Sequence, residues 1–275
     1  MSIDNDQPSL PLRGTLTPIY ILSFIVAVLV AAASTAGLFL QRTLYATDDL
    51  LQSFLPNDVV HLIIGLPILL VSLWLTYRGR RIGLLLWPGA LFYFLYDYLV
   101  YVLAMPLNAV KFLYLGLVAI SASALVVLLV RIDKKDVQQK LSSTLPVRLC
   151  GGILIAFGVL FFLRAASILI AAFTGQSPIA RAEIALNTTD LLISPVWVVC
   201  GWMLWKRKAF GYATGLGMLF QASMLFIGLI IFLLLQPILT AAPFVLIDVL
   251  VVFAMGLVCF IPFGLFVRGV LSGRP

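Results

Sequence analysis

The sequence predicts an all-α integral membrane protein with eight transmembrane helices. Of its 275 residues, 63% are apolar and 11% are charged, whereas an ordinary soluble domain is roughly 25% charged. Apolar windows of about 20 residues, the length of a helix that crosses a ~30 Å hydrocarbon core, recur along the whole chain. They begin at Thr17, Asp58, Ile82, Val110, Leu149, Asp190, Gly211 and Phe244.

The basic residues predict the orientation. Cytoplasmic loops of membrane proteins carry an excess of Lys and Arg, and here 14 of the 18 basic residues fall on one side of the predicted spans. The even number of spans then puts both termini in the cytoplasm. This placement accounts for the net charge of +7, so we expect no nucleic-acid partner. We expect a prokaryotic-type plasma (inner) membrane.

The first half of the chain begins with a polar arm, residues 1–16, which lacks the pattern of a cleavable signal peptide. In the first span, the small residues from Ala31 to Gly37 suit close packing of helices. Thr47 is then expected to cap a short amphipathic helix on the outer surface, which Pro56 ends. After the fourth span, a charged cytoplasmic linker, residues 132–145, separates the two halves.

An ungapped shift of 128 residues aligns the two halves with each other. It pairs Pro67 with Pro195, Trp74 with Trp202, Arg78 with Lys206, Gly83 with Gly211 and Gly89 with Gly217. We therefore predict two parallel four-helix repeats, residues 17–131 and 146–275, related by an axis near the membrane normal. The second half also has a predicted outer surface helix, from Ser177 to Leu186, with Pro178 at its first helical position.

A carboxylate, Asp97, lies within the aromatic third span. A charged side chain in hydrocarbon costs about 3 kcal/mol or more, so it usually faces a protein interior or a wet cavity beside a partner. Arg164 in the fifth span lies at the same distance from the cytoplasmic end, about 22 Å at 1.5 Å per residue. We expect Asp97 and Arg164 to form an ion pair, which either lines a ligand pocket or locks two helices together.

Tyrosines surround Asp97. Tyr93 and Tyr101 lie one turn to either side of it on one helix face, and Tyr96 precedes it. Their phenols can hydrogen-bond the carboxylate or hold a cation, although Tyr101 also suits an interfacial aromatic belt. The repeat mates of Tyr93, Tyr96 and Asp97 are Gln221, Met224 and Leu225, and that of Arg164 is Ala36. This asymmetry indicates a specialised site.

Other polar residues gather on the outer side. Asp58 and His61 lie one turn apart at the start of the second span, and Lys111, Asp190 and Asp248 lie near the outer ends of later spans. Each also has a structural explanation: the two aspartates 58 and 190 suit helix caps, the lysine can snorkel to the interface, and Asp248 lies close to its helix end.

Several chemistries are not expected. His61 is the single histidine, and no Cys, His or carboxylate set has metal-ligand spacing. Phosphate-loop and dinucleotide motifs are also missing, so we expect neither a metal nor a cofactor. The cysteines, Cys150, Cys200 and Cys259, fall in spans without a C-x-x-C pair. They suit packing rather than disulfide chemistry.

These features leave three hypotheses about function. The first is a transporter or ligand-binding membrane protein that binds a small molecule, ion or lipid in the outer half of the bilayer. Its pocket would be lined by Asp97, Arg164, Tyr93, Tyr96, Tyr101, Lys111 and Asp248. The alternative is an intramembrane enzyme that acts on a lipid or lipid-linked substrate, with Asp58 and His61 as an acid/base pair. The third is a non-catalytic partner subunit. An oligomer is left open.

Overall fold

A computed structural model of the chain describes residues 10–107, 109–143, 145–175 and 179–272. In this part of the chain, eight helical segments are long and apolar enough to cross a membrane. The elements in order are α1 (Thr17–Phe39), α2 (Gln41–Leu44), α3 (Asp48–Val60), the π-helix η1 (His61–Gly65), α4 (Leu66–Tyr77), α5 (Arg81–Ala104), α6 (Ala109–Arg131), α7 (Lys134–Leu141), α8 (Val147–Phe173), α9 (Arg181–Trp205), α10 (Ala209–Leu239) and α11 (Leu246–Ser272). The predicted all-helical fold is confirmed, and so is the prediction of eight helices long and apolar enough to cross a membrane.

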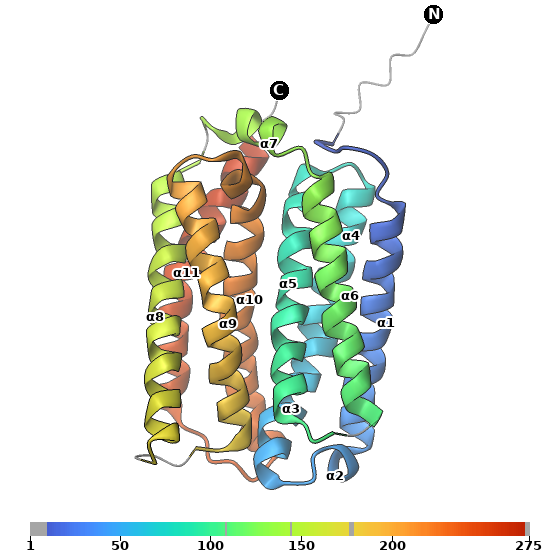
Figure 1. Cartoon of the computed structure of the whole chain (residues 1–275), viewed down its shortest axis with the longest axis vertical. Coiled ribbons are helices and arrows are strands. Elements are labelled where there is room, and N and C mark those ends of the chain that lie inside the picture. The colour runs from blue at the N-terminus through green and yellow to red at the C-terminus, as the bar shows by residue number, and fades with distance from the viewer. Residues whose placement is uncertain (1–9, 108, 144, 176–178, 273–275) are drawn as a thin grey trace, which may run out of the picture.

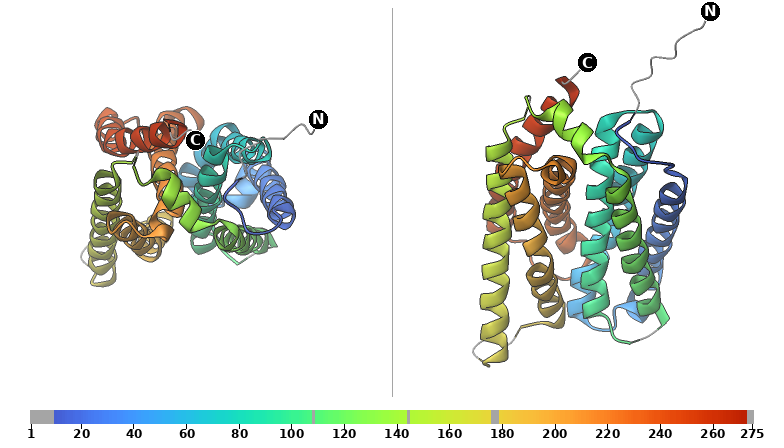
Figure 2. Two further views of the ribbon diagram at one scale, coloured as in Figure 1. Left: turned by 90° about the horizontal axis from the view of Figure 1, so that it is seen from above. Right: turned by 45° about the horizontal axis from the view of Figure 1, so that its top comes forward.

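Two bundles of four spans stand side by side (Figure 1). The first contains α1, the continuous run from α3 to α4, α5 and α6; the second contains α8 to α11. The short α7 crosses between the bundles at one end, which we call the α7 end, and the start of α3 lies at the other, the α3 end (Figures 1 and 2). The start of α1 and the end of α11 both lie at the α7 end.

The bundles meet where α5 packs against α10. In this contact Gly89 faces Gly217, and a Cβ atom on Gly89 would overlap the carbonyl group of Gly217. Only glycine permits this approach of the two backbones. The positions are 128 residues apart, so the shift that aligns the halves also relates the two sides of this contact.

The turns that join α4 to α5 and α9 to α10 have the same backbone. The central residue of each turn has a left-handed conformation, with φ of 71° at Gly79 and 55° at Arg207. The backbone N–H of the next residue donates to the carbonyl five residues before it. The distance is 2.9 Å from Arg80 N to Leu75 O in one turn and 2.8 Å from Lys208 N to Met203 O in the other. Arg207 therefore occupies a conformation that favours glycine.

The first predicted surface helix is the beginning of the second span, so the prediction that Pro56 ends it was wrong. Thr47 does cap α3, because its side chain accepts a bond from Leu50 N at 3.3 Å. Pro56 lies inside α3, and its missing N–H leaves the Gln52 carbonyl without its helical donor. Gln236 Nε2 of α10 donates to that carbonyl at 3.1 Å instead, which joins the two bundles.

The second predicted surface helix, residues 177–186, is likewise the beginning of a span. Its first two residues lie outside the described part of the chain, and α9 begins at Arg181. The backbone N–H of Ala182, in the first turn of α9, donates to Asp49 Oδ2 of α3 at 3.4 Å. A carboxylate at a helix N-terminus is electrostatically favourable, so this contact also joins the bundles at the α3 end.

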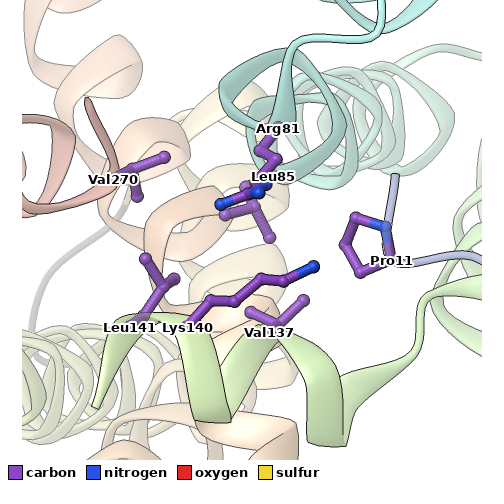
Figure 3. A pocket seen from close by; sticks show the side chains of 7 residues that line it. All are labelled: Pro11, Arg81, Leu85, Val137, Lys140, Leu141 and Val270. Atoms are coloured by element: carbon purple, nitrogen blue, oxygen red, sulfur yellow. The ribbon is translucent and has the colours of Figure 1, made fainter. Parts of the chain in front are cut away.

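At the α7 end, the segment before α1 is bonded to the segment between α6 and α7. Residues 11–13 pair with residues 131–133 through backbone bonds and through an ion pair of 3.0 Å between Arg13 Nε and Asp133 Oδ2. The Arg13 guanidinium lowers the pKa of the Asp133 carboxyl. Figure 3 shows a hollow beneath α7 that is lined by Pro11, Arg81, Leu85, Val137, Lys140, Leu141 and Val270.

Replacement of Arg207 by glycine is expected to stabilise the protein by about 1 kcal/mol, because a left-handed conformation is unfavourable for a residue with a Cβ atom. Thermal unfolding of the purified protein in detergent measures the change. Arg207→Ala removes the same charge but keeps the Cβ atom, and should give no increase. Equal stabilisation by both variants would assign the effect to charge and contradict the prediction.

Candidate functional site

A buried group of polar side chains lies toward the α3 end of the first bundle. We call it the histidine cluster; its members are Ser34, Tyr45, Asp58, His61, Asp97, Tyr98 and Tyr101. They come from α1, the loop before α3, the α3–η1 run and α5. All are less than a tenth exposed. Buried ionisable groups in a membrane span are expensive unless they are paired, and they commonly mark function.

His61 lies at the centre and has no exposed surface. Its Nε2 atom is 3.1 Å from Asp97 Oδ2 and 3.3 Å from Asn57 Nδ2. Its Nδ1 atom is 3.5 Å from Ser34 Oγ, which in turn is 3.4 Å from the Tyr98 hydroxyl. The imidazole therefore connects α1, α3 and α5 through both of its ring nitrogens.

The helix changes form at this histidine. Residues His61–Gly65 are π-helical, between the α-helical turns of α3 and α4. Pro67 is the second residue of α4, and its missing N–H leaves the Ile63 carbonyl without an α-helical donor. Isolated π-helical turns are often found at functional sites. Here the irregular turn carries the imidazole into the bundle interior.

Asp58 is the second carboxylate of the cluster and is 1% exposed. It accepts bonds from the Tyr45 hydroxyl at 2.5 Å and from the Tyr101 hydroxyl at 3.0 Å. Burial and the adjacent Asp58 carboxylate raise the pKa of the Tyr45 phenol, so this phenol remains a donor. Gly37 of α1 makes room for the carboxylate, because a Cβ atom there would overlap Asp58.

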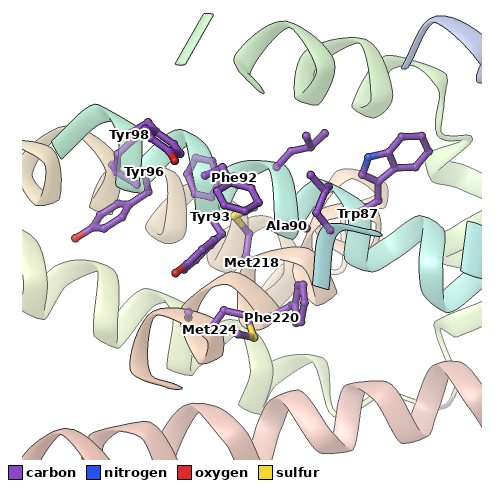
Figure 4. Close-up of a cluster of buried hydrophobic side chains, with 14 of the residues drawn as sticks. Trp87, Ala90, Phe92, Tyr93, Tyr96, Tyr98, Met218, Phe220 and Met224 are labelled. Atoms are coloured by element: carbon purple, nitrogen blue, oxygen red, sulfur yellow. The ribbon is translucent and has the colours of Figure 1, made fainter. Parts of the chain in front are cut away.

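Aromatic rings enclose His61 on several sides. The ring centroids of Tyr93, Phe94, Tyr98 and Tyr101 lie 5.2 to 6.1 Å from the imidazole. All four residues belong to α5, and Figure 4 shows two of them, Tyr93 and Tyr98, among the buried side chains of this helix. The rings exclude solvent and strengthen the electrostatic interactions inside the cluster.

A second polar group joins the two bundles. The Tyr96 hydroxyl of α5 donates to Asp190 Oδ1 of α9 at 2.6 Å, and Arg164 of α8 lies with its guanidinium 3.6 Å from Asp190 Oδ2. We call these three residues the arginine triad. Since Tyr96 and Asp97 are consecutive on α5, this helix carries both polar groups.

The expected ion pair between Asp97 and Arg164 was wrong. In the described part of the chain the two residues form no ion pair with each other; His61 is the partner of Asp97, and Asp190 is the partner of Arg164. Counting residues along a span gives depth, but it does not give the direction in which a side chain points around the helix axis. Depth alone could not assign the partners.

Several structural explanations of single residues were also wrong. Asp58 and Asp190 lie inside helices and bind tyrosine hydroxyls, so neither is a helix cap. Tyr101 is 1% exposed and does not belong to an interfacial belt. Lys111 Nζ donates to the Met105 carbonyl at the end of α5, and Asp248 is exposed in the first turn of α11. These last two residues are not members of either polar group.

Three members of the histidine cluster were not predicted. Ser34 lies in a small-residue run that indicated packing, Tyr45 lies in a loop, and Tyr98 lies on a different face of α5 from Asp97. A tyrosine just before a polar helix start was the available signal for Tyr45.

The cluster is suited to holding protons. Two carboxylates and one imidazole share a solvent-poor interior, and tyrosine hydroxyls supply further donors. Within the described residues, no three His, Cys, Asp or Glu side chains form a potential metal site. Because Asp58 and His61 have almost no exposed surface, this conformation gives a lipid substrate no access to them, and it does not support the enzyme hypothesis.

Comparisons with protein-family models, curated proteins and solved structures give no match to this chain.

Replacement of Tyr96 by phenylalanine is expected to destabilise the protein by about 1 to 3 kcal/mol, because buried Asp190 loses its 2.6 Å donor. Thermal unfolding in detergent provides the measurement. The control is Tyr77→Phe, since Tyr77 is 80% exposed. Adding Asp190→Asn tests the pair directly: the two changes should be non-additive, and additive effects would contradict the proposed coupling.

Proposed function

We propose that this protein is a multi-pass membrane transporter in which the histidine cluster binds and releases a proton. The observation that carries the proposal is the placement of His61: it is completely buried, it contacts Asp97 at 3.1 Å, and Asp58 lies one turn away on the same helical run. Intramembrane Asp, Glu and His groups of this kind form proton relays in transporters.

The charges of these groups support proton binding. With a neutral imidazole and two ionised carboxylates, the cluster would hold two uncompensated negative charges inside an apolar bundle, which is strongly unfavourable. One added proton on His61, or on either carboxylate, lowers that charge. Binding or release of a proton at the cluster therefore changes the interactions of Asp58 and Asp97.

Proton exchange would change the contacts between three helical segments, because the cluster residues belong to α1, the α3–η1 run and α5. The π-helical turn at His61 is the irregular element among them, and π-bulges and prolines allow helices to bend. On α5, the residue beside Asp97 is Tyr96, which binds Asp190 of the second bundle. A change at Asp97 thus reaches the contact between the bundles through adjacent residues.

Proton flux into liposomes tests this function and requires no added substrate. Purified protein is reconstituted in liposomes that contain a pH-sensitive dye, and a pH step is applied with the membrane potential clamped. We expect flux above that of protein-free liposomes. His61→Gln and Asp97→Asn should each reduce it about tenfold, the effect of a barrier raised by ~1.4 kcal/mol.

The matched control is Ser121→Ala, which removes a buried hydroxyl that has no hydrogen-bond partner. It should retain wild-type flux. Size-exclusion profiles and helical circular dichroism show whether each variant is folded. Absence of flux in the wild type, or wild-type flux in both folded cluster variants, would overturn the proposal.

We also propose that the α7 end faces the cytoplasm of a prokaryotic-type cell and that the halves are parallel repeats. The basic loops at this end support the orientation. The facing glycines 89 and 217, and the matching left-handed turns, support the repeat. In both turns a basic side chain also covers the preceding tryptophan ring, Arg78 on Trp74 at 5.1 Å and Lys206 on Trp202 at 4.8 Å.

Cysteine labelling tests both statements. Arg80→Cys and Lys208→Cys change exposed repeat mates at the α7 end, and Gln41→Cys changes an exposed residue at the α3 end. A membrane-impermeant maleimide applied to whole cells should label only the third variant, and all three after the cells are opened. The natural cysteines are buried. Labelling of Arg80→Cys and Lys208→Cys from opposite sides would exclude parallel repeats.

A further inference from the structure

The side chain of Arg164 is partly exposed on the membrane-facing side of α8. Its side chain is 47% exposed, although it lies within α8 between residues that face lipid, such as Leu160 at 49% and Leu163 at 60% exposure. The structure leaves this guanidinium partly uncovered in surroundings where an uncovered charge is unfavourable.

Arg164 lies within the hydrocarbon core, below the membrane surface at the α3 end. Helix α8 has 27 residues, or about 40 Å at 1.5 Å per residue, which exceeds the ~30 Å hydrocarbon core by about 10 Å. Arg164 precedes the last residue of the helix, Phe173, by about 13 Å. It therefore lies roughly 8 Å inside the hydrocarbon, close enough for its long side chain to meet a headgroup that is drawn inward.

The protein uses only a small part of the hydrogen-bonding capacity of the Arg164 guanidinium. Asp190 Oδ2 is 3.6 Å away, and among the described residues Arg164 makes no hydrogen bond. The other oxygen of Asp190 already accepts the 2.6 Å bond from Tyr96. A guanidinium has five N–H donors in a planar fork, so most of its donors are available to an acceptor from outside the chain.

Two polar residues lie between Arg164 and the α3 end of α8. Ser167 lies one turn further along α8 and Thr174 lies at the end of the helix, and both are exposed. At a spacing of three residues Ser167 shares the side of the helix that carries Arg164, whereas the Thr174 hydroxyl donates to the Ile170 carbonyl within its own helix. The apolar residues next to Arg164 and Ser167, including Leu163, suit acyl chains.

We propose that Arg164 binds the phosphodiester headgroup of an anionic phospholipid, with Ser167 beside the headgroup and the acyl chains on the exposed leucines of α8. A phosphate accepts two parallel hydrogen bonds from a guanidinium. The single contact to Asp190 leaves the N–H donors for these bonds available. This lipid site is separate from the histidine cluster and does not depend on proton transport. The bound lipid would cover the charge and connect the arginine triad to the membrane.

Native mass spectrometry of the full-length protein tests the lipid site. Protein in mild detergent is mixed with equal amounts of phosphatidylglycerol and phosphatidylcholine of the same chain length, and the bound fractions are compared. Wild type should prefer phosphatidylglycerol. Arg164→Gln should reduce the preference about fivefold, the effect of one basic side chain near anionic lipid.

The matched control is Arg181→Gln, which removes an exposed arginine from the start of α9 and should keep the preference. Ser167→Leu leaves the charge in place but puts a bulky apolar side chain beside the headgroup, and should also weaken phosphatidylglycerol binding. This variant tests the site if Arg164→Gln does not fold. Soluble glycerophosphoglycerol should not displace the lipid, because it lacks acyl chains.

Three results would overturn the lipid site. One is an unchanged preference in folded Arg164→Gln and Ser167→Leu. Another is complete displacement by glycerophosphoglycerol, which would indicate a soluble anion site. The third is a shift from dimer to monomer in Arg164→Gln without a change in bound lipid, which would show that a second copy of the chain covers the arginine.

Discussion

The contact between His61 and Asp97 determines how the first bundle is arranged. Neither group is stable alone in an apolar interior, so the helices that carry them must bring them together. The contact joins the α3–η1 run to α5, and Ser34 adds α1 through the other ring nitrogen. Gly37 and the π-helical turn then follow as geometric requirements: one leaves space for Asp58, and the other accompanies the entry of the imidazole into the bundle.

Helix α5 is the element that relates the two polar groups. Consecutive residues on a helix point about 100° apart, so Asp97 faces His61 within the first bundle while Tyr96 faces Asp190 in the second. The same helix packs against α10 at Gly89, where the backbone of Gly217 leaves no room for a Cβ atom. A bulky residue at that point would separate the helices and lengthen the 2.6 Å bond of Tyr96. Close backbone packing in the half of the bundle nearer the α7 end thus supports the polar contact nearer the α3 end.

The sequence was sufficient for the helical fold and for the number of helices long and apolar enough to cross a membrane, since these depend on composition and on the length of the apolar segments. It was insufficient for the pairing of Asp97, because the direction of a side chain around a helix depends on which helices are neighbours. Pro56 shows a second limit. A proline usually ends a helix, but here an amide from α10 replaces the missing donor by binding the Gln52 carbonyl, and only the tertiary structure contains that information.

The two bundles differ in how well their polar groups are satisfied. In the first, the carboxylates and tyrosines of the histidine cluster bind one another. Among the described residues, four buried polar side chains have an atom without a partner, and three of them, Asn187, Gln221 and Ser223, belong to the second bundle. Buried polar atoms without partners are uncommon in native proteins and call for water or a ligand. Arg164, with most of its donors unused, belongs to the same bundle. The unpartnered atoms of Asn187, Gln221 and Ser223 lie inside the bundle, whereas the half-exposed Arg164 side chain is the group of the second bundle that can reach molecules in the membrane.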